Sequence, residues 1–169
     1  MKVLAAVRLT RSHLPGMTRR GRGRSQYIAS DWRGRHPGRD DPLRHAKTAL
    51  FAVSRGFAKE AAGTGVTVNS VIIGATHTGG VEDFVYELVD KDLPRDEVQR
   101  EFVRRHRPRS LLQRLIEPEE TAHMVVHLGS PQASATTGGA LRVDGSYADA
   151  ILPRPARYSA EPCDPATRG

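Results

Sequence analysis

Two residues in the first third of the chain are of types that can do chemistry together: the hydroxyl of Ser30 and the amine of Lys47. A lysine beside a serine can act as the base that activates a serine nucleophile, which is the chemistry of some hydrolases. Neither a nucleophile elbow nor an oxyanion motif accompanies this pair, so the sequence disfavours a hydrolase. Taken alone, Ser30 is more often a structural residue at a strand end, and Lys47 a solvated helix residue.

A second set of polar residues follows a hydrophobic run at 66–73. The loop that begins at Gly74 is rich in small hydroxyl residues and includes Thr76 and Thr78. The run itself, VTVNSVII, is rich in β-branched residues, which favours a strand buried on both faces of a parallel sheet.

Cysteine and histidine usage argues against a metal centre or a disulfide framework. The single cysteine, Cys163, lies in a Pro-rich tail, so the chain holds no cysteine pair. His123 and His127 lie one helical turn apart, but no acidic HExxH pattern accompanies them. We therefore expect no metal site.

The chain has 169 residues and a formal net charge of +7, and this charge is unevenly distributed. Residues 1–47 carry 12 Lys and Arg against three Asp and Glu, and residues 48–169 carry 14 against 16. The length fits one domain. The longest apolar run is far below the ~18 residues of a membrane span, and we expect a cytoplasmic protein.

Hydrophobic periodicity predicts alternating helices and strands. The predicted helices cover 3–14, 42–62, one or two segments between 81 and 106 that break near Pro94, and 118–129; the predicted strands cover 26–30, 66–73 and 138–143. Pro15 and Gly16 are expected to end the first helix. This order predicts an α/β fold whose parallel strands are joined by right-handed crossovers.

Several of these segments resemble short-chain dehydrogenase/reductases. The similar segments are VRLTRSHLPGM (7–17), YIAS (27–30), residues 47–84, and residues 118–147 with their TGG…VDG ending. The resemblance implies a Rossmann-like parallel sheet that is truncated, because the N-terminal βαβ dinucleotide-binding half is missing. It covers most of residues 3–151, which we expect to form one partial domain (1–151), with 152–169 as a disordered tail.

The resemblance implies a specific chemistry. In that family an Asn-Ser-Tyr-Lys set transfers a hydride and a proton between NAD or NADP and a small alcohol or carbonyl substrate. Ser30 matches the serine that binds the reacting oxygen. Lys47 matches the lysine that lowers the tyrosine pKa and holds the nicotinamide ribose. Gly74, Thr76 and Thr78 match residues that face the nicotinamide.

The sequence departs from the family pattern at three places. The acid/base tyrosine position, four residues before Lys47, is Leu43, and the asparagine position falls at Lys2. The Gly-rich loop that holds the cofactor pyrophosphate is missing. We therefore expect an incomplete catalytic set, weak dinucleotide binding and no turnover by the chain as written.

Residues 31–46 fit neither the family nor a helical or strand period, although the spacing from Ser30 to Lys47 matches the family. A family-like segment, IPAEMIHYGM, can be encoded as ATC CCG GCC GAG ATG ATC CAC TAC GGC ATG. Read from its third base, this DNA encodes P-G-R-D-D-P-L-R-H, which is Pro37 to His45 of this chain. We therefore expect 31–46 to be an out-of-frame reading of the active-site segment.

Three functions remain open at this stage. The first is an NAD(P)-dependent oxidoreductase by descent, inactive as written. The second is a non-catalytic protein that forms a homo- or hetero-oligomer with a full-length relative through helices 3–14 and 42–62. The third, a nucleic-acid binder, is disfavoured because the Arg-rich stretch 19–44 contains only two aromatic residues, Tyr27 and Trp32.

Two further expectations concern surfaces. A three-stranded sheet whose one face lacks its partner helices would expose apolar surface and associate or aggregate. Residues 79–110, which would line a substrate site, carry no recognisable pocket signature, so the sequence does not indicate the substrate.

Overall fold

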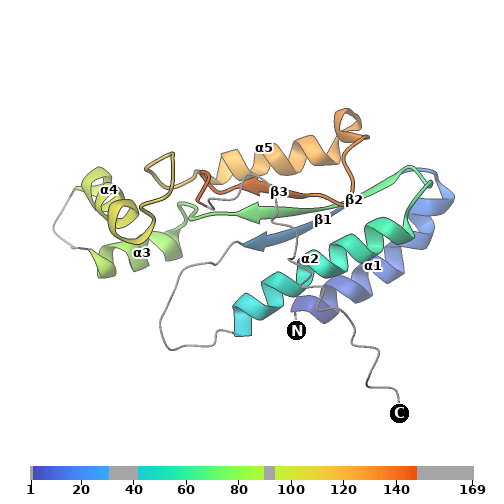
Figure 1. Ribbon diagram of the computed structural model, residues 1–169, viewed down its shortest axis with the longest axis horizontal. Coiled ribbons are helices and arrows are strands. Elements are labelled where there is room, and N and C mark those ends of the chain that lie inside the picture. The colour runs from blue at the N-terminus through green and yellow to red at the C-terminus, as the bar shows by residue number, and fades with distance from the viewer. Residues whose placement is uncertain (1, 31–41, 90–93, 148–169) are drawn as a thin grey trace, which may run out of the picture.

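The computed structural model describes the backbone of residues 2–30, 42–89 and 94–147 (Figure 1). The elements are α1 (Lys2–Arg19), β1 (Gly23–Ser30), α2 (Pro42–Glu60), β2 (Val66–Ile73), α3 (Gly79–Leu88), α4 (Arg95–His106), α5 (Pro118–Gly129), the short 3₁₀ helix η1 (Pro131–Ala133) and β3 (Ala140–Val143). The predicted break near Pro94 lies between α3 and α4. The predicted tail 152–169 and most of the atypical segment 31–46 lie outside the described residues.

The strands form one parallel sheet in the order β1-β2-β3. Ser30 of β1 is paired with Ile73 of β2, and Ile73 is paired with Val143 of β3. All three strands therefore end at the same edge of the sheet. The central strand β2 is buried along nearly its whole length. The parallel order of the three strands confirms the predicted α/β Rossmann-like sheet.

Helices cover both faces of this sheet, α1 and α2 on one and α5 on the other (Figure 1). Val68 of β2 packs with Leu14 of α1 and Leu50 of α2. Val71 points to the opposite face and packs with Leu128 of α5. The prediction that one face of the sheet lacks its partner helices is therefore wrong for the described part of the chain.

The two crossover connections have opposite hands. The connection from β1 to β2 runs over the face covered by α2, and the connection from β2 to β3 runs over the face covered by α5. Both connections step in the same direction across a parallel sheet. Opposite faces then require opposite hands, so the rule that predicted right-handed crossovers holds for only one of them.

Helix α1 continues past its predicted end. It runs through Pro15 to Arg19, although proline removes one backbone hydrogen bond from a helix interior. The extra turn brings Met17 into the core, where it packs against the cluster that includes Leu14 and Tyr27. A Cβ on Gly23 would lie 2.6 Å from Met17 Cβ. Glycine at this position therefore lets the chain begin β1 directly beside the helix, three residues earlier than predicted.

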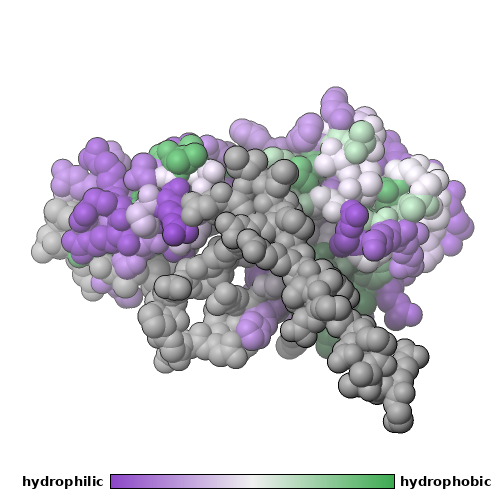
Figure 2. Space-filling view, viewed as in Figure 1, coloured by the Kyte–Doolittle hydropathy of each residue, from purple (hydrophilic) through white to green (hydrophobic). Residues whose placement is uncertain are grey.

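The segment from α3 to α5 forms a second small core beyond the end of the sheet. Val85 of α3 packs with Val98, Phe102 and Val103 of α4 and with Leu115. The outer side of α4 is strongly hydrophilic (Figure 2). Helix α5 then begins with Pro118 in its first turn and a capping box between Glu117 and Glu120. This segment forms the second wall of the site described below.

The most exposed large apolar residues of α1 are Leu4 and Leu9, with 63% and 61% of their surface accessible. Leu9, Tyr27 and Ile28 line a groove of about 290 Å³ between α1 and β1. Among the described residues, no helix is both long enough and apolar enough to cross a membrane.

Candidate active site at the carboxyl end of the sheet

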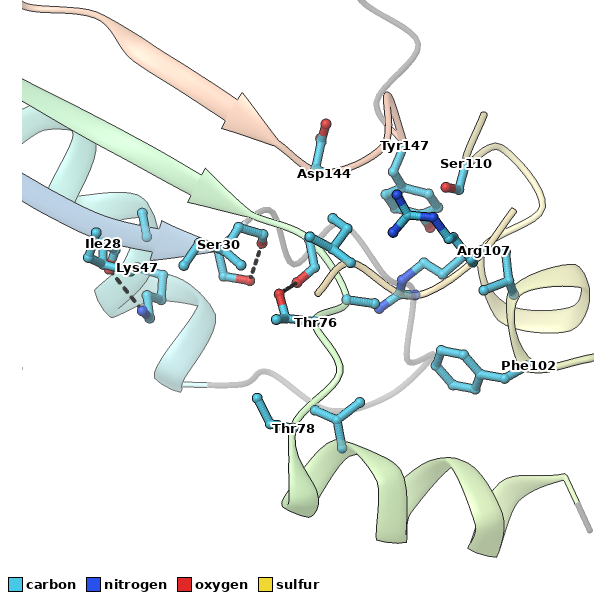
Figure 3. A pocket seen from close by; sticks show the side chains of 18 residues that line it. Ile28, Ser30, Lys47, Thr76, Thr78, Phe102, Arg107, Ser110, Asp144 and Tyr147 are labelled. Atoms are coloured by element: carbon cyan, nitrogen blue, oxygen red, sulfur yellow. Dashed lines mark hydrogen bonds between the residues drawn. The ribbon is translucent and has the colours of Figure 1, made fainter. Parts of the chain in front are cut away.

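A pocket of about 320 Å³ lies where the three strands end (Figure 3). The five residues predicted from the sequence all line it: Ser30, Lys47, Gly74, Thr76 and Thr78. They come from β1, α2 and the loop after β2, and are separated by up to 48 positions in the chain. The fold thus brings the predicted set together at the sheet edge where parallel α/β sheets bind ligands.

Lys47 lies on α2 and reaches back to β1. Its Nζ donates a hydrogen bond to the carbonyl oxygen of Ile28, at 2.9 Å. Partial burial lowers the pKa of the Lys47 amine, and the positive charge of Lys2 lowers it further. Lys2 therefore acts on Lys47 electrostatically, as a second cation.

Ser30 is the last residue of β1. Its Oγ donates to the carbonyl oxygen of Ile73, at 3.2 Å. A hydroxyl has one donor and two acceptor lone pairs, so Ser30 keeps its acceptor capacity while this bond fixes its position between the ends of β1 and β2.

The loop after β2 begins with a close approach of two backbones. The N–H of Gly74 donates to Val143 O at 2.9 Å, and a Cβ on Gly74 would lie 2.7 Å from Asp144 Cα. Glycine is therefore required here. Thr76 Oγ1 then donates to Gly74 O at 3.3 Å, and the backbone of Thr76 forms a bridge with Ile116.

Thr78 is the N-cap residue of α3, with extended backbone geometry and no side-chain capping bond. Its side chain is exposed at the mouth of the pocket, and in Figure 3 it lies below Thr76, next to the start of α3. Thr76 and Thr78 thus place two hydroxyl groups along one side of the pocket.

The residue that the sequence predicts at the acid/base position, Leu43, belongs to the first turn of α2. Leu43 lies one helical turn before Lys47 on that helix. A leucine side chain has no ionisable group. The position that carries a phenol in the resembled family therefore supplies no proton donor or acceptor here.

The sequence did not indicate the opposite wall of the pocket. This wall includes Phe102, Arg107, Ser110, Asp144 and Tyr147. The guanidinium of Arg107 lies over the Tyr147 ring, 5.0 Å from its centroid. Residues 79–110, which carry no pocket signature in the sequence, therefore contribute side chains to the site.

A long-range contact assembles that wall. The N–H of Leu111 donates to Gly145 O at 2.8 Å, which ties the segment after α4 to the turn after β3. Asp144 directly follows β3 in the chain. It is buried, accepts a bond from Arg142 Nε at 2.8 Å, and is also bonded by the N–H of Ser146 at 3.1 Å. The periodicity of a single segment carries no signal for contacts of this kind.

Within the described ranges 2–30, 42–89 and 94–147, no group of three or more His, Cys, Asp or Glu side chains could hold a metal ion. The polar side chains of the pocket are instead hydroxyls, an amine, guanidinium groups and the single carboxylate of Asp144. These groups suit hydrogen bonding to an organic ligand that carries oxygen atoms.

Comparisons with known proteins point to one family. A family model described as enoyl-(acyl carrier protein) reductase matches residues 1–148. The uncharacterized oxidoreductase YvaG of Bacillus subtilis is 39% identical over 153 residues, which cover 90% of this chain and 58% of that protein. The chain therefore spans little more than half the length of this curated relative.

Solved structures show the same partial coverage. The L-sorbose reductase of Gluconobacter frateurii, complexed with NADPH and L-sorbose, matches with a TM-score of 0.72 and 29% identity, over 89% of this chain and 57% of that one. An actinorhodin polyketide ketoreductase with NADPH matches with a TM-score of 0.72 and 27% identity, over the same shares of the two chains.

Proposed function

Because the chain belongs to the short-chain dehydrogenase/reductase family, we propose that its pocket binds the nicotinamide end of NAD or NADP beside a small alcohol or carbonyl substrate. The observation that carries this proposal is the convergence of Ser30, Lys47, Gly74, Thr76 and Thr78 on one pocket. The solved relatives that match the chain include enzymes whose structures contain NADPH.

The residues present fit one end of the cofactor. A volume of about 320 Å³ is near the lower limit for small-molecule sites, so it suits a nicotinamide ring and a small substrate but not a whole dinucleotide. Lys47 would hold the ribose hydroxyls, and Thr76 and Thr78 would face the ring. The sequence lacks the Gly-rich loop for the pyrophosphate, so we propose weak binding.

The remaining chemistry falls to the side chains of this chain. The bound nicotinamide would supply the hydride donor or acceptor. Ser30 Oγ would hydrogen-bond the reacting oxygen of the substrate, since its position is fixed by the bond to Ile73 O. Leu43 cannot move the accompanying proton. Loss of a positioned acid/base group costs about 10²–10⁴ in rate, so we propose that the chain as written does not turn over.

Titration of NADH and NADPH into the 169-residue chain, followed by nicotinamide fluorescence, tests this function. We expect saturable binding that is lost in Lys47→Ala and kept in Lys59→Ala, which removes an exposed lysine in the last turn of the same helix. Equal binding by the two variants, or no saturable binding by the parent chain, would contradict the proposal.

The exposed apolar residues of α1 favour a second candidate, a non-catalytic protein that pairs with itself or with a full-length family member. Leu4 and Leu9 are both exposed on α1, and Leu9 lines the groove between α1 and β1. Sedimentation velocity of the chain, alone and mixed with a full-length member, tests this. Pairing should be abolished by Leu4→Glu with Leu9→Glu, and a chain that stays monomeric in both samples would exclude it.

We further propose that 1–151 is one partial domain of a cytoplasmic protein and that 31–46 is read out of frame in the gene. Resequencing the DNA from upstream of the first codon through Lys47 tests the second point. An alternative frame that encodes a tyrosine at position 43 would support it. DNA with no such frame would exclude it.

A further inference from the structure

The wall of the pocket opposite Lys47 carries a positive group with no role in the proposed chemistry. Arg107 follows directly after α4 and lines the pocket beside Ser110 and Tyr147. In Figure 3, Lys47 and Ser30 lie at one end of the pocket and these three residues at the other, with Thr76 and Thr78 between them. A ligand that spans the pocket would meet both groups.

The charged residues that line the pocket are three positive and one negative: Lys47, Arg107 and Arg114 against Asp144. The carboxylate of Asp144 is buried and bonded by Arg142 and by the N–H of Ser146, so it is turned to the protein. Arg114 is held by both carboxylate oxygens of Glu120, at 2.7 Å each. The lining thus favours an anion, and Arg107 is the positive group at the end away from Ser30.

Arg107 is also held in place. Its Nη1 donates to His106 O at 3.0 Å, and its guanidinium lies over the Tyr147 ring. A guanidinium has five N–H donors in a rigid planar fork, so contacts to the protein are compatible with a two-point contact to a carboxylate. Stacking on an aromatic ring orients the fork and lowers the entropy lost on binding.

We infer that Arg107 binds a carboxylate on the substrate, so that the pocket selects hydroxy acids and the corresponding oxo acids over neutral alcohols and ketones. This inference rests on the proposed function, because Ser30 defines the end that receives the reacting oxygen. The apolar side chains of Val81 and Phe102 line the pocket as well and suit a short aliphatic link between the two oxygen-bearing groups.

Ligand-observed NMR on the 169-residue chain tests the inference with 3-hydroxybutanoate, 4-hydroxypentanoate and 5-hydroxyhexanoate, each compared with its neutral amide. We expect at least one acid to bind about 10–100-fold more tightly than its amide, the range of a charge-assisted hydrogen bond. Arg107→Gln should remove this preference, and Arg107→Lys, which keeps the charge without the fork, should retain part of it.

Arg100→Gln is the matched control, since it removes an exposed positive charge from α4 outside the pocket lining. It should leave the preference intact. Far-ultraviolet circular dichroism and thermal unfolding must show that Arg107→Gln is folded; if it is not, the comparison rests on Arg107→Lys. Equal binding of every acid and its amide by the parent chain would overturn the inference.

The same variants separate a substrate carboxylate from a cofactor phosphate, which has similar oxygen chemistry. NADPH affinity should be unchanged by Arg107→Gln, and a fall in NADPH affinity would reassign Arg107 to a phosphate and overturn the inference. If NADPH does not bind but an acid binds in an Arg107-dependent way, the proposed cofactor site fails and the carboxylate site stands. If NADPH binds and no acid is preferred over its amide, the carboxylate site fails and the proposed cofactor site stands.

Discussion

The Nζ of Lys47 lies 2.9 Å from the carbonyl oxygen of Ile28, a hydrogen bond that joins α2 to β1 across residues 31–41. It holds the amine beside Ser30, at the end of the same strand, although 16 residues separate the two in the sequence. This contact links the fold to the proposed chemistry, because the backbone of β1, the strand that ends at Ser30, holds the Lys47 amine in the site.

The Lys47 amine should respond to Lys2. Burial lowers the Lys47 pKa first, and the Lys2 charge lowers it further. Lys2→Asn removes only the second cause, so the Lys47 pKa should rise and yet stay below its ordinary value of about 10.4. NMR of the lysine side-chain signals as a function of pH measures this. A Lys47 pKa that does not change in Lys2→Asn would contradict the described arrangement.

Restoring a phenol at position 43 should create activity. Leu43→Tyr places an acid/base group one helical turn before Lys47, and we expect about 10²–10⁴-fold faster NADPH-dependent reduction across a panel of small ketones and oxo acids. Leu4→Tyr, at an exposed position of α1, is the control and should match the parent chain. If Leu43→Tyr binds NADPH but reduces nothing faster than the parent, the assignment of position 43 is wrong.

Gly74→Ala should destabilise the fold by about 1–3 kcal/mol, because the new Cβ would meet Asp144 Cα at 2.7 Å. Gly56→Ala is the matched control: it lies inside α2 with nothing within 4 Å of the added atom, and should stabilise the chain by ~0.5–1 kcal/mol. Urea unfolding followed by circular dichroism measures both. Equal effects of the two changes would argue against the close contact at Gly74.

Lowering the pH should weaken the ion pair between Arg114 and Glu120 at the start of α5. The Arg114 guanidinium lowers the pKa of Glu120 to about 2, with help from the N–H of Glu117. Since an unfolded glutamate has a pKa near ~4.3, this stabilisation is complete above that pH and is lost as the pH falls toward about 2. Over this pH range, the free energy of unfolding should therefore decrease less steeply in Glu120→Gln than in the parent chain.

The control for that experiment is Glu119→Gln, a change in the same helical turn at an exposed residue. Its acid dependence should follow that of the parent chain. If Glu119→Gln and Glu120→Gln flatten the curve equally, the effect belongs to the general charge of the helix end and not to the pair with Arg114.

The sequence predicted the elements well where a pattern is local. The β-branched run of β2 and the proline-led start of α5 have the predicted bounds. Helix α1 runs past Pro15 because Met17 gains a place in the core, a tertiary effect that a local pattern cannot carry. A tertiary effect also explains why the sequence did not indicate the pocket wall that includes Arg107 and Tyr147. These two residues meet because a backbone hydrogen bond joins Leu111 to Gly145, 34 positions later in the chain.

The most direct test of the nicotinamide site uses the four lysines of the chain: Lys2, Lys47, Lys59 and Lys91. Reductive ¹³C-methylation, with each signal assigned by Lys→Arg substitution, allows NADPH to be titrated while every lysine is observed separately. We predict a saturable shift of the Lys47 signal with no shift at Lys59. Saturable binding of NADPH that leaves the Lys47 signal unmoved would contradict the proposed site.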